Sequence, residues 1–304
     1  MSAAFEEALK KGNISYRKNV LTAGLSTFRI GGRCPFGVEP ACIGELCQAL
    51  LLCRRAGLSY RVIGRASNIL FDDAHLPHVL IRMLRLDGLR IGGDGVVIAD
   101  CGVMLPHLAR RAADCGFADL CFAVGIPGTV GGGIYMNAGA HGSCLGELVD
   151  RATVFLIDRN EITTYFNNEL NFSYRKSEIQ RNNAIVLQVA FHLTDKVAPH
   201  VAQERIKGLL ARRAAMQPLH LPSAGSAFLR PATGEPMGRI LDELGLKGLR
   251  CGNAAVSEKH AGFIVNLGGA TAADVLALVA LIQKIVQKER GFCPQSEICY
   301  VRQE

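Results

Sequence analysis

One stretch of the chain, residues 125–142, combines dense glycine with polar side chains in a way that suits a phosphorylated ligand. It holds seven glycines, whereas 33 glycines in 304 residues correspond to about two in any 18. Glycine lets a backbone approach a ligand closely, and successive bare amides bind anions such as a diphosphate. This glycine-rich segment is neither a Walker loop nor a GxGxxG fingerprint. A tight set of turns is the alternative, but Asn137 beside the glycines favours ligand binding.

Two shorter segments offer side chains that recognise anions. Residues 64–68 are Gly-Arg-Ala-Ser-Asn and follow an apolar run; Ser67 and Asn68 carry donors for phosphate oxygens, although Ser-Asn is equally typical of an ordinary turn. Residues 174–177 are Tyr-Arg-Lys-Ser, and the Arg175 guanidinium suits a carboxylate through two parallel hydrogen bonds. A surface position without function is the alternative for this second segment.

The C-terminal third contributes two more polar clusters. Residues 222–228 place Ser226 among small residues, which leaves its hydroxyl accessible, but they lack the Gly-x-Ser-x-Gly elbow of a hydrolase nucleophile. In residues 256–265 four polar residues precede an apolar strand. Lys259 suits a phosphate as a point charge, whereas His260 is of a type that is more often structural. The sequence predicts no metal site, because no cysteine or carboxylate cluster accompanies the histidines.

The elements that must position these motifs follow from apolar periodicity. Before Pro199 we expect helices at 44–57 and 106–115, a loop at 120–140, and strands at 60–64, 79–83, 96–100, 152–157, 161–165 and 184–193. After it we expect helices at 201–217, 236–244 and 272–290 and strands at 262–265 and 297–302. Thr271 is the predicted N-cap of the last helix, with Asp274 in a capping-box position and Gly291 at its end. The pattern predicts an α+β protein in at least two parts.

Charge and cysteine content exclude several classes of protein. The net charge of +7 is spread out, with no basic run longer than two residues, which disfavours a nucleic-acid binder. None of the eleven cysteines forms a CxxC pair, and residues 1–18 lack the apolar core of a secretory signal. These features predict a reducing, cytoplasmic compartment.

Taken together and in this order, the motifs resemble the UDP-N-acetylenolpyruvoylglucosamine reductase (MurB) family, which are flavoenzymes of peptidoglycan precursor synthesis. The short path from Tyr174 to Ser226 resembles the more compact subtype of that family. The resemblance covers nearly the whole chain and is carried by residues 27–32 (Thr-Phe-Arg-Ile-Gly-Gly), Ser67-Asn68, 125–142, 174–177, 223–226, 256–266 and Glu297.

The resemblance implies an α+β architecture. It consists of a FAD-binding fold of the vanillyl-alcohol-oxidase (PCMH) type in two subdomains, plus a C-terminal α+β substrate-binding domain. On this chain the FAD-binding region would be residues 1–195, with subdomains at about 20–85 and 86–195. The substrate-binding domain would be residues 200–304, and its last strand, about 295–304, is a candidate to return to the FAD region.

The resemblance also implies a reaction and its residues. NADPH would reduce non-covalently bound FAD, which would then reduce UDP-N-acetylglucosamine enolpyruvate to UDP-N-acetylmuramate, in a monomer or weak dimer that needs no nucleic acid or membrane. Ser226 would be the proton donor, and Arg175 and Glu297 would polarise the substrate carboxylate. The implied substrate-binding residues are Tyr174, Arg230, Lys259 and His260. The implied cofactor-binding residues are Gly64, Arg65, Ala66, Ser67, Asn68, Gly125, Ile126, Pro127, Gly128, Gly131, Gly132, Asn137 and Gly139.

The chain departs from the usual family pattern at a few positions. Ala66 stands where glycine is common, and Arg65 stands where glycine or a small polar residue is common. Leu229 replaces a lysine, while the next residue, Arg230, keeps a basic group, and His141 stands where an aromatic residue is usual.

Three other functions remain open from the sequence. A flavoenzyme of the same fold could oxidise a small alcohol with oxygen, although the Arg175, Ser226 and Glu297 set argues against it. A catalytically silent protein could bind a nucleotide sugar without FAD. A nucleic-acid binder would show salt-dependent retention on DNA.

Overall fold

The computed structural model describes residues 2–303 as mixed helices and strands in two compact units. The first unit comprises Met1–Tyr16, Val38–Arg65 and Leu80–Arg213, and the second comprises Arg17–Gly37, Ala66–Val79 and Ala214–Glu304. The units thus interleave along the chain, which no shift in composition indicates. The sequence-based division near Pro199 stays a prediction.

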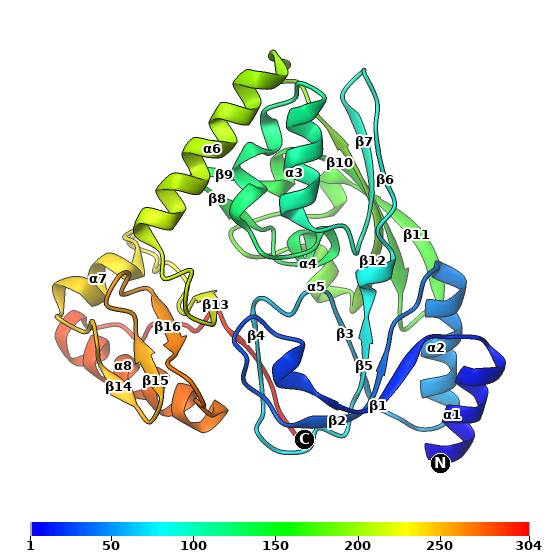
Figure 1. The fold of residues 1–304 in the computed structure, drawn as a ribbon, viewed down its shortest axis with the longest axis horizontal. Helices are drawn as coiled ribbons and strands as arrows, with labels where there is room; N and C mark the ends of the chain where they lie inside the picture. The colour runs from blue at the N-terminus through cyan, green and yellow to red at the C-terminus, as the bar shows by residue number, and fades with distance from the viewer. Residues whose placement is uncertain (1, 304) are drawn as a thin grey trace. The chain divides into compact units, whose positions relative to one another are not determined.

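An antiparallel five-stranded sheet forms the centre of the first unit, in the order β11-β10-β12-β7-β6 (Figure 1). Strand β12 lies in the middle and is buried along almost its whole length, whereas the edge strand β11 is largely exposed. Helices α3 and α4 pack against this sheet. The bounds are β6 Leu89–Ile91, β7 Val96–Asp100, α3 Leu105–Asp114, α4 Val130–Tyr135, β10 Val149–Leu156, β11 Glu161–Phe166 and β12 Ala184–His192.

Shorter elements complete the first unit. Helix α1 packs against α2, β3 is a neighbour of β5, and β8 and β9 form a two-stranded hairpin. Val79 of β5 and the last three residues of α6 belong to the second unit. The bounds are α1 Ser2–Lys11, α2 Ile43–Arg55, β3 Tyr60–Ile63, β5 Val79–Arg82, β8 Gly139–Ala140, β9 Ser143–Cys144, α5 Glu178–Arg181 and α6 Pro199–Met216.

The second unit is built on an antiparallel sheet in the order β13-β16-β15-β14, which helix α8 contacts (Figure 1). Strands β1 and β2 are neighbours, and β17 pairs in parallel with β4. The bounds are β1 Tyr16–Leu21, β2 Arg33–Val38, β4 Ile69–Phe71, β13 Ser223–Ser226, α7 Met237–Glu243, β14 Arg250–Cys251, β15 Ala254–Val256, β16 Phe263–Asn266, α8 Ala272–Arg290 and β17 Cys299–Val301.

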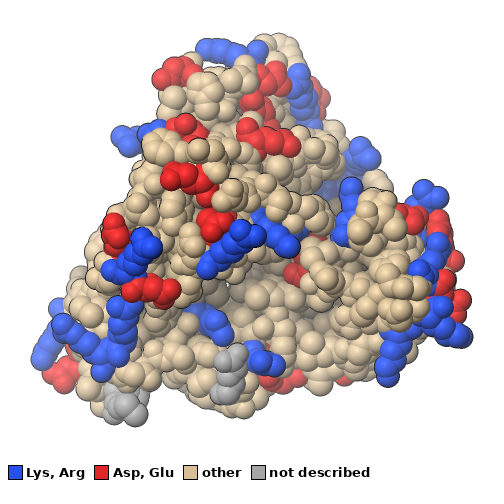
Figure 2. Space-filling model, turned by 180° about the vertical axis from the view of Figure 1, so that it is seen from behind, with Lys and Arg blue, Asp and Glu red and all other residues tan. Residues whose placement is uncertain are grey.

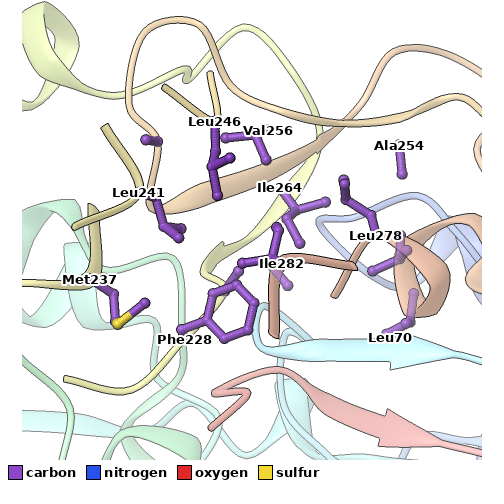
Figure 3. Close-up of a cluster of buried hydrophobic side chains, with 14 of the residues drawn as sticks. Leu70, Phe228, Met237, Leu241, Leu246, Ala254, Val256, Ile264, Leu278 and Ile282 are labelled. Atoms are coloured by element: carbon purple, nitrogen blue, oxygen red, sulfur yellow. The ribbon is translucent and has the colours of Figure 1, made fainter. Parts of the chain in front are cut away.

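A large apolar cluster joins many of the elements of the second unit. Figure 3 shows Ile282 of α8 facing Phe228 and Ile264, with Leu246 and Met237 around them. Full burial of each large aliphatic side chain contributes about 1.5–3 kcal/mol, so this cluster is a main source of the unit's stability. The buried side chains of α8 recur at helical spacing, as its sequence predicts: Ala272, Val275, Leu278, Ile282 and Val286.

Helix α8 has the predicted signals at both ends. The Thr271 side chain accepts from the Asp274 N–H, the Asp274 carboxylate accepts from the Thr271 N–H, each at 3.0 Å, and Gly291 ends the helix with φ +77°. A further cap comes from the turn after β4, where the Asp73 carboxylate accepts from the Ala272 N–H at 2.8 Å. The capping prediction is confirmed, and Asp73 adds a contact that spans 199 residues.

Two expectations about elements were wrong. The loop expected at 120–140 contains a 3₁₀ helix, Asp119–Gly125, and helix α4. The region after Pro199 holds β13, β14 and β15 besides the predicted strands, and its last strand is shorter than 297–302. Strands of two to four residues are too short to show alternation, and a six-residue helix with three glycines has no helical propensity signal.

Surface charge, helix length and the placement of metal-binding side chains concern possible nucleic-acid, membrane and metal partners. On the face shown in Figure 2, basic and acidic side chains are interspersed, in keeping with a spread-out net charge. Within residues 2–303, no helix combines the length and apolarity that crossing a bilayer requires. The same residues contain no group of three or more His, Cys, Asp and Glu side chains placed to hold a metal ion.

Candidate active site

Hydrogen bonds hold the glycine-rich segment in place within the first unit. Thr129 caps α4 by accepting from the Gly132 N–H at 3.3 Å, and the Gly131 N–H donates to the Cys101 carbonyl at 2.8 Å. These two amides are therefore occupied by the protein itself. The Gly128 N–H, in contrast, makes no hydrogen bond within residues 2–303 and can donate to a ligand.

Gly64 and Gly131 lie so close to neighbouring atoms that a side chain at either position would not fit. A Cβ at Gly64, just after β3, would collide with the Thr129 hydroxyl, and a Cβ at Gly131 would lie 2.9 Å from the Cβ of Cys101. The end of β3 therefore packs directly on the Thr129 side chain that caps α4. Glycine at position 64 permits this close packing of the two predicted anion-binding segments.

Asn137 joins the glycine-rich segment to the loop that carries Arg175. Its buried amide donates to the Ser173 carbonyl at 3.0 Å and accepts from the Gly146 N–H at 2.9 Å. Arg175 in turn donates to the carbonyl oxygens of Asn137 and Gly139, at 3.5 and 3.4 Å. The structure thus brings two motifs that are separate in the sequence together within the first unit.

The conformation of the Arg175 loop is held at several points. Arg175 has φ +57°, a left-handed conformation that is uncommon for a residue with a side chain, and its guanidinium lies 5.1 Å from the centre of the exposed Tyr174 ring. Gln180 donates to the Arg175 carbonyl at 3.1 Å, and the buried Ser177 hydroxyl donates to the Tyr135 carbonyl at 2.8 Å. The backbone around Arg175 is therefore fixed by groups beyond the predicted site residues.

The 64–68 turn is divided between the units, with Ala66, Ser67 and Asn68 in the second. Ala66 is buried and has φ +52°, which is the conformation that glycine adopts most easily and accounts for the glycine usual at this position. The Asn68 side chain donates to the Glu297 carbonyl at 2.9 Å.

Ser226 and Glu297 lie on adjacent stretches of the second unit. The Glu297 N–H donates to the carbonyl of Ala227 at 2.9 Å, and the Ala227 N–H donates to the Gly262 carbonyl at 2.8 Å. Ser226 ends β13 with an exposed side chain, and Glu297 is half-buried. A hydroxyl and a carboxyl from positions 71 apart in the sequence are therefore carried side by side.

Lys259 and His260 follow β15 in a tight turn in which the Ser257 hydroxyl accepts from both of their N–H groups. The Lys259 ammonium donates to the Ala214 carbonyl at 2.6 Å, in the last turn of α6, where a cation stabilises the helix terminus. His260 accepts from the Gly262 N–H through Nδ1 at 3.1 Å, so Nδ1 carries no proton. Burial lowers the pKa of His260, which keeps the ring neutral near pH 7.

The sequence-predicted site residues thus form one group in each unit. The first unit holds Gly64, Arg65, Gly125, Ile126, Pro127, Gly128, Gly131, Gly132, Asn137, Gly139, Tyr174 and Arg175. The second holds Ala66, Ser67, Asn68, Ser226, Arg230, Lys259, His260 and Glu297. The sequence does not predict the supporting contacts of Thr129, Gln180 and Thr27, because side chain-to-backbone bonds have no sequence signature.

Comparison with known proteins identifies the family. Residues 217–301 match the family model described as UDP-N-acetylenolpyruvoylglucosamine reductase, C-terminal domain, and residues 36–164 match that of a FAD binding domain. A UDP-N-acetylenolpyruvoylglucosamine reductase of Caldicellulosiruptor saccharolyticus is 38% identical over 300 residues, covering 98% of this chain and 95% of the relative. The chain belongs to the MurB family. The family and the flavin-binding α+β fold that the motifs imply are thereby confirmed.

Other MurB relatives extend the comparison. The reductase of Latilactobacillus sakei subsp. sakei is 40% identical over 283 residues, covering 93% of this chain and 91% of the relative. The crystal structure of MurB from Thermus caldophilus superposes with a TM-score of 0.78 at 32% identity, covering 94% of this chain and 98% of that one. The chain therefore corresponds to nearly the full length of the MurB proteins it matches.

The first unit fits the FAD that a MurB protein binds. The FAD-domain match, residues 36–164, contains both Gly64 and the glycine-rich segment, in which the Gly128 N–H can donate to a diphosphate. No carboxylate belongs to the predicted cofactor-binding set, so no negative side chain from that set opposes the phosphates.

Proposed function

We propose that the chain catalyses the NADPH-dependent, FAD-mediated reduction of UDP-N-acetylglucosamine enolpyruvate to UDP-N-acetylmuramate in peptidoglycan precursor synthesis. The observation that carries this function is the MurB match over nearly the entire chain, in which Ser226 and Glu297 are neighbours in the fold. FAD, when bound, supplies hydride transfer from NADPH to the enolpyruvyl carbon.

The residues that hold FAD in this proposal are Gly64, Arg65, Ala66 and Ser67 of the turn after β3, together with the glycine-rich segment. The Gly128 N–H donates to the diphosphate in this proposal. Asn137 fixes the segment by its two hydrogen bonds, so its effect on the cofactor is indirect.

The chemistry of the second unit follows from the charge that hydride addition creates. Adding hydride to an enol ether places negative charge on the carbon beside the substrate carboxylate, as an enolate. Ser226 donates the proton that quenches this charge, and Arg175 and Glu297 polarise the carboxylate. A glutamate beside a carboxylate requires that one of them is protonated or that a cation screens the pair, and we assign the screening to Arg175.

The substrate itself carries a diphosphate and a carboxylate, which call for cations. We assign the diphosphate to Lys259 and Arg230, and the packing of sugar or base to Tyr174, whose ring is 51% exposed. His260 is neutral, so it contributes a hydrogen-bond donor through Nε2 rather than a charge.

Further assignments belong to this proposal. Residues 1–195 would hold the FAD and residues 200–304 the substrate. We also propose a cytoplasmic monomer or weak dimer that acts without membrane or nucleic acid. Eleven free cysteines and interspersed surface charge support that setting.

Rapid-mixing kinetics of Ser226→Ala test the assignment. Reduction of bound FAD by NADPH should proceed at the wild-type rate, whereas reoxidation by the enolpyruvyl substrate should slow by about 10²-fold or more, the usual contribution of a general acid. Ser223→Ala, on the same strand, is the matched control and should leave both half-reactions unchanged. Unchanged reoxidation in Ser226→Ala would remove Ser226 from the mechanism. Reoxidation by oxygen that is faster than by the sugar nucleotide in the wild type would favour an oxidase.

A further inference from the structure

Asn68, in the turn before β4, is bonded to the stretch that carries Glu297, within the second unit. The Asn68 side chain donates to the Glu297 carbonyl at 2.9 Å, and the Cys299 N–H donates to the Asn68 carbonyl at 2.9 Å. These contacts continue as the parallel pairing of β4 with β17. One amide hydrogen of Asn68 is therefore committed to the chain that carries Glu297.

The Glu297 backbone is held from two sides. Its N–H donates to the Ala227 carbonyl, next to Ser226, and its C=O accepts from Asn68. Bonds at both its N–H and its C=O restrict the direction in which the Glu297 side chain leaves the backbone. If the bond to Asn68 is lost, the bond to Ala227 and the bond from the Ile298 N–H to the Ser296 hydroxyl at 3.2 Å remain, but the Glu297 carbonyl loses one restraint.

Thr27 forms the corresponding contact on the Ser226 side. Its hydroxyl donates to the Ser223 carbonyl at 2.8 Å, at the start of β13, and lies 3.5 Å from the Ser67 carbonyl. Because a hydroxyl has a single hydrogen, the shorter contact is the bond. The half-buried Thr27 thus stands between the Ser67 backbone and the strand that ends at Ser226.

We propose that Asn68 and Thr27 are positioning residues for the protonation half of the reaction, acting through Glu297 and Ser226 respectively. This inference rests on the proposed function. It gives the Asn68 side chain a different role from the phosphate contact that its sequence position suggests. Asn68 ties the Glu297 backbone to the turn before β4, and Thr27 ties the start of β13 to the segment of residues 27–32.

The size of the effect follows from the sensitivity of catalysis to geometry. A displacement of about 1 Å can cost about 10²-fold in rate. Asn68→Ala removes the hydrogen bond to the Glu297 carbonyl and leaves the bond from the Glu297 N–H in place, so a smaller displacement and a slowing of about 10-fold in reoxidation are expected. Binding of FAD and its reduction by NADPH should stay within about 2-fold of wild type, because neither depends on the Glu297 side chain.

Two kinds of measurement test this, one of them independent of catalysis. Hydrogen exchange of the flavin-free protein should show faster exchange for peptides covering residues 295–301 in Asn68→Ala, with residues 149–166 of the first-unit sheet unchanged as an internal control. Half-reaction kinetics should show slowed reoxidation in Asn68→Ala and Thr27→Val, and recovery in the conservative Thr27→Ser, which keeps the hydroxyl.

A double variant separates positioning from cofactor binding. If Asn68 acts through Glu297, adding Asn68→Ala to Glu297→Gln should slow reoxidation by less than about 2-fold further, since interacting residues are not additive. Weakened FAD binding with slowed reduction by NADPH in Asn68→Ala would overturn the proposal and return Asn68 to the cofactor. Unchanged exchange at 295–301 would overturn it as well. Failure of the wild type to be reoxidised by the enolpyruvyl substrate would instead refute the proposed function and leave the exchange result standing.

Discussion

Asn266 is the polar residue whose removal should cost the second unit most. It ends β16, is 4% exposed, and uses both ends of its amide. Nδ2 donates to the carbonyls of Phe28 at 3.1 Å and Arg29 at 3.4 Å, while Oδ1 accepts from the N–H groups of Gly268 at 2.8 Å and Ala270 at 3.0 Å. It thereby ties the motif of residues 27–32 to the chain leading into α8.

The cost of Asn266→Ala follows from these contacts. Three of the four bonds have good length, and at about 0.5–1.5 kcal/mol each they sum to a loss of about 1.5–4.5 kcal/mol in the free energy of unfolding. The real loss should fall in the upper half of that range, because the variant leaves buried backbone groups without partners.

Urea unfolding followed by far-UV circular dichroism measures this loss. Asn253→Ala is the matched control, because Asn253 is exposed and its bond to Asp274 is made by its backbone N–H, which the variant keeps. The variant should change stability by less than about 0.5 kcal/mol. If Asn266→Ala costs under about 1 kcal/mol, or no more than the control, the hydrogen-bond argument for this residue is refuted.

Two further predictions concern the first unit and the pH dependence of stability. Gly64→Ala should weaken FAD binding by about 10-fold or more, because the new methyl collides with the Thr129 hydroxyl, whereas Gly208→Ala, exposed on α6, should leave the dissociation constant unchanged in a flavin fluorescence titration. Burial holds the folded-state pKa of His260 below its usual value, so the unfolded chain takes up the proton first and stability falls as pH drops below about 6.5. His260→Gln should flatten the melting temperature between pH 7.5 and 5.5; an equally steep profile in the variant would assign the dependence to other groups.

Local chemistry made several elements predictable. Strand β7 occupies the expected residues 96–100, the hairpin β10–β11 turns at the expected place, and α8 starts and stops at its predicted caps. These are cases in which a periodic apolar pattern and a terminating residue lie within the same short window.

The features that could not be predicted from the sequence depend on contacts between distant residues. Helix α4 forms in glycine-rich sequence because Thr129 caps it and because Gly133 fits against Leu145 and Leu105, where a Cβ would clash. The bond from Asn68 to Glu297 spans 229 residues, and no spacing rule reports it. The site residues themselves were predicted from the MurB resemblance rather than from any local pattern, and their roles stay predictions.

The visible spectrum of the purified protein, recorded without oxygen, is the decisive measurement of the proposed reaction. We predict a yellow protein with flavin absorbance that NADPH bleaches and that UDP-N-acetylglucosamine enolpyruvate then restores, with UDP-N-acetylmuramate as product. A colourless protein that FAD cannot reconstitute would refute the proposed reaction, as would a bleached flavin that the enolpyruvyl substrate leaves reduced.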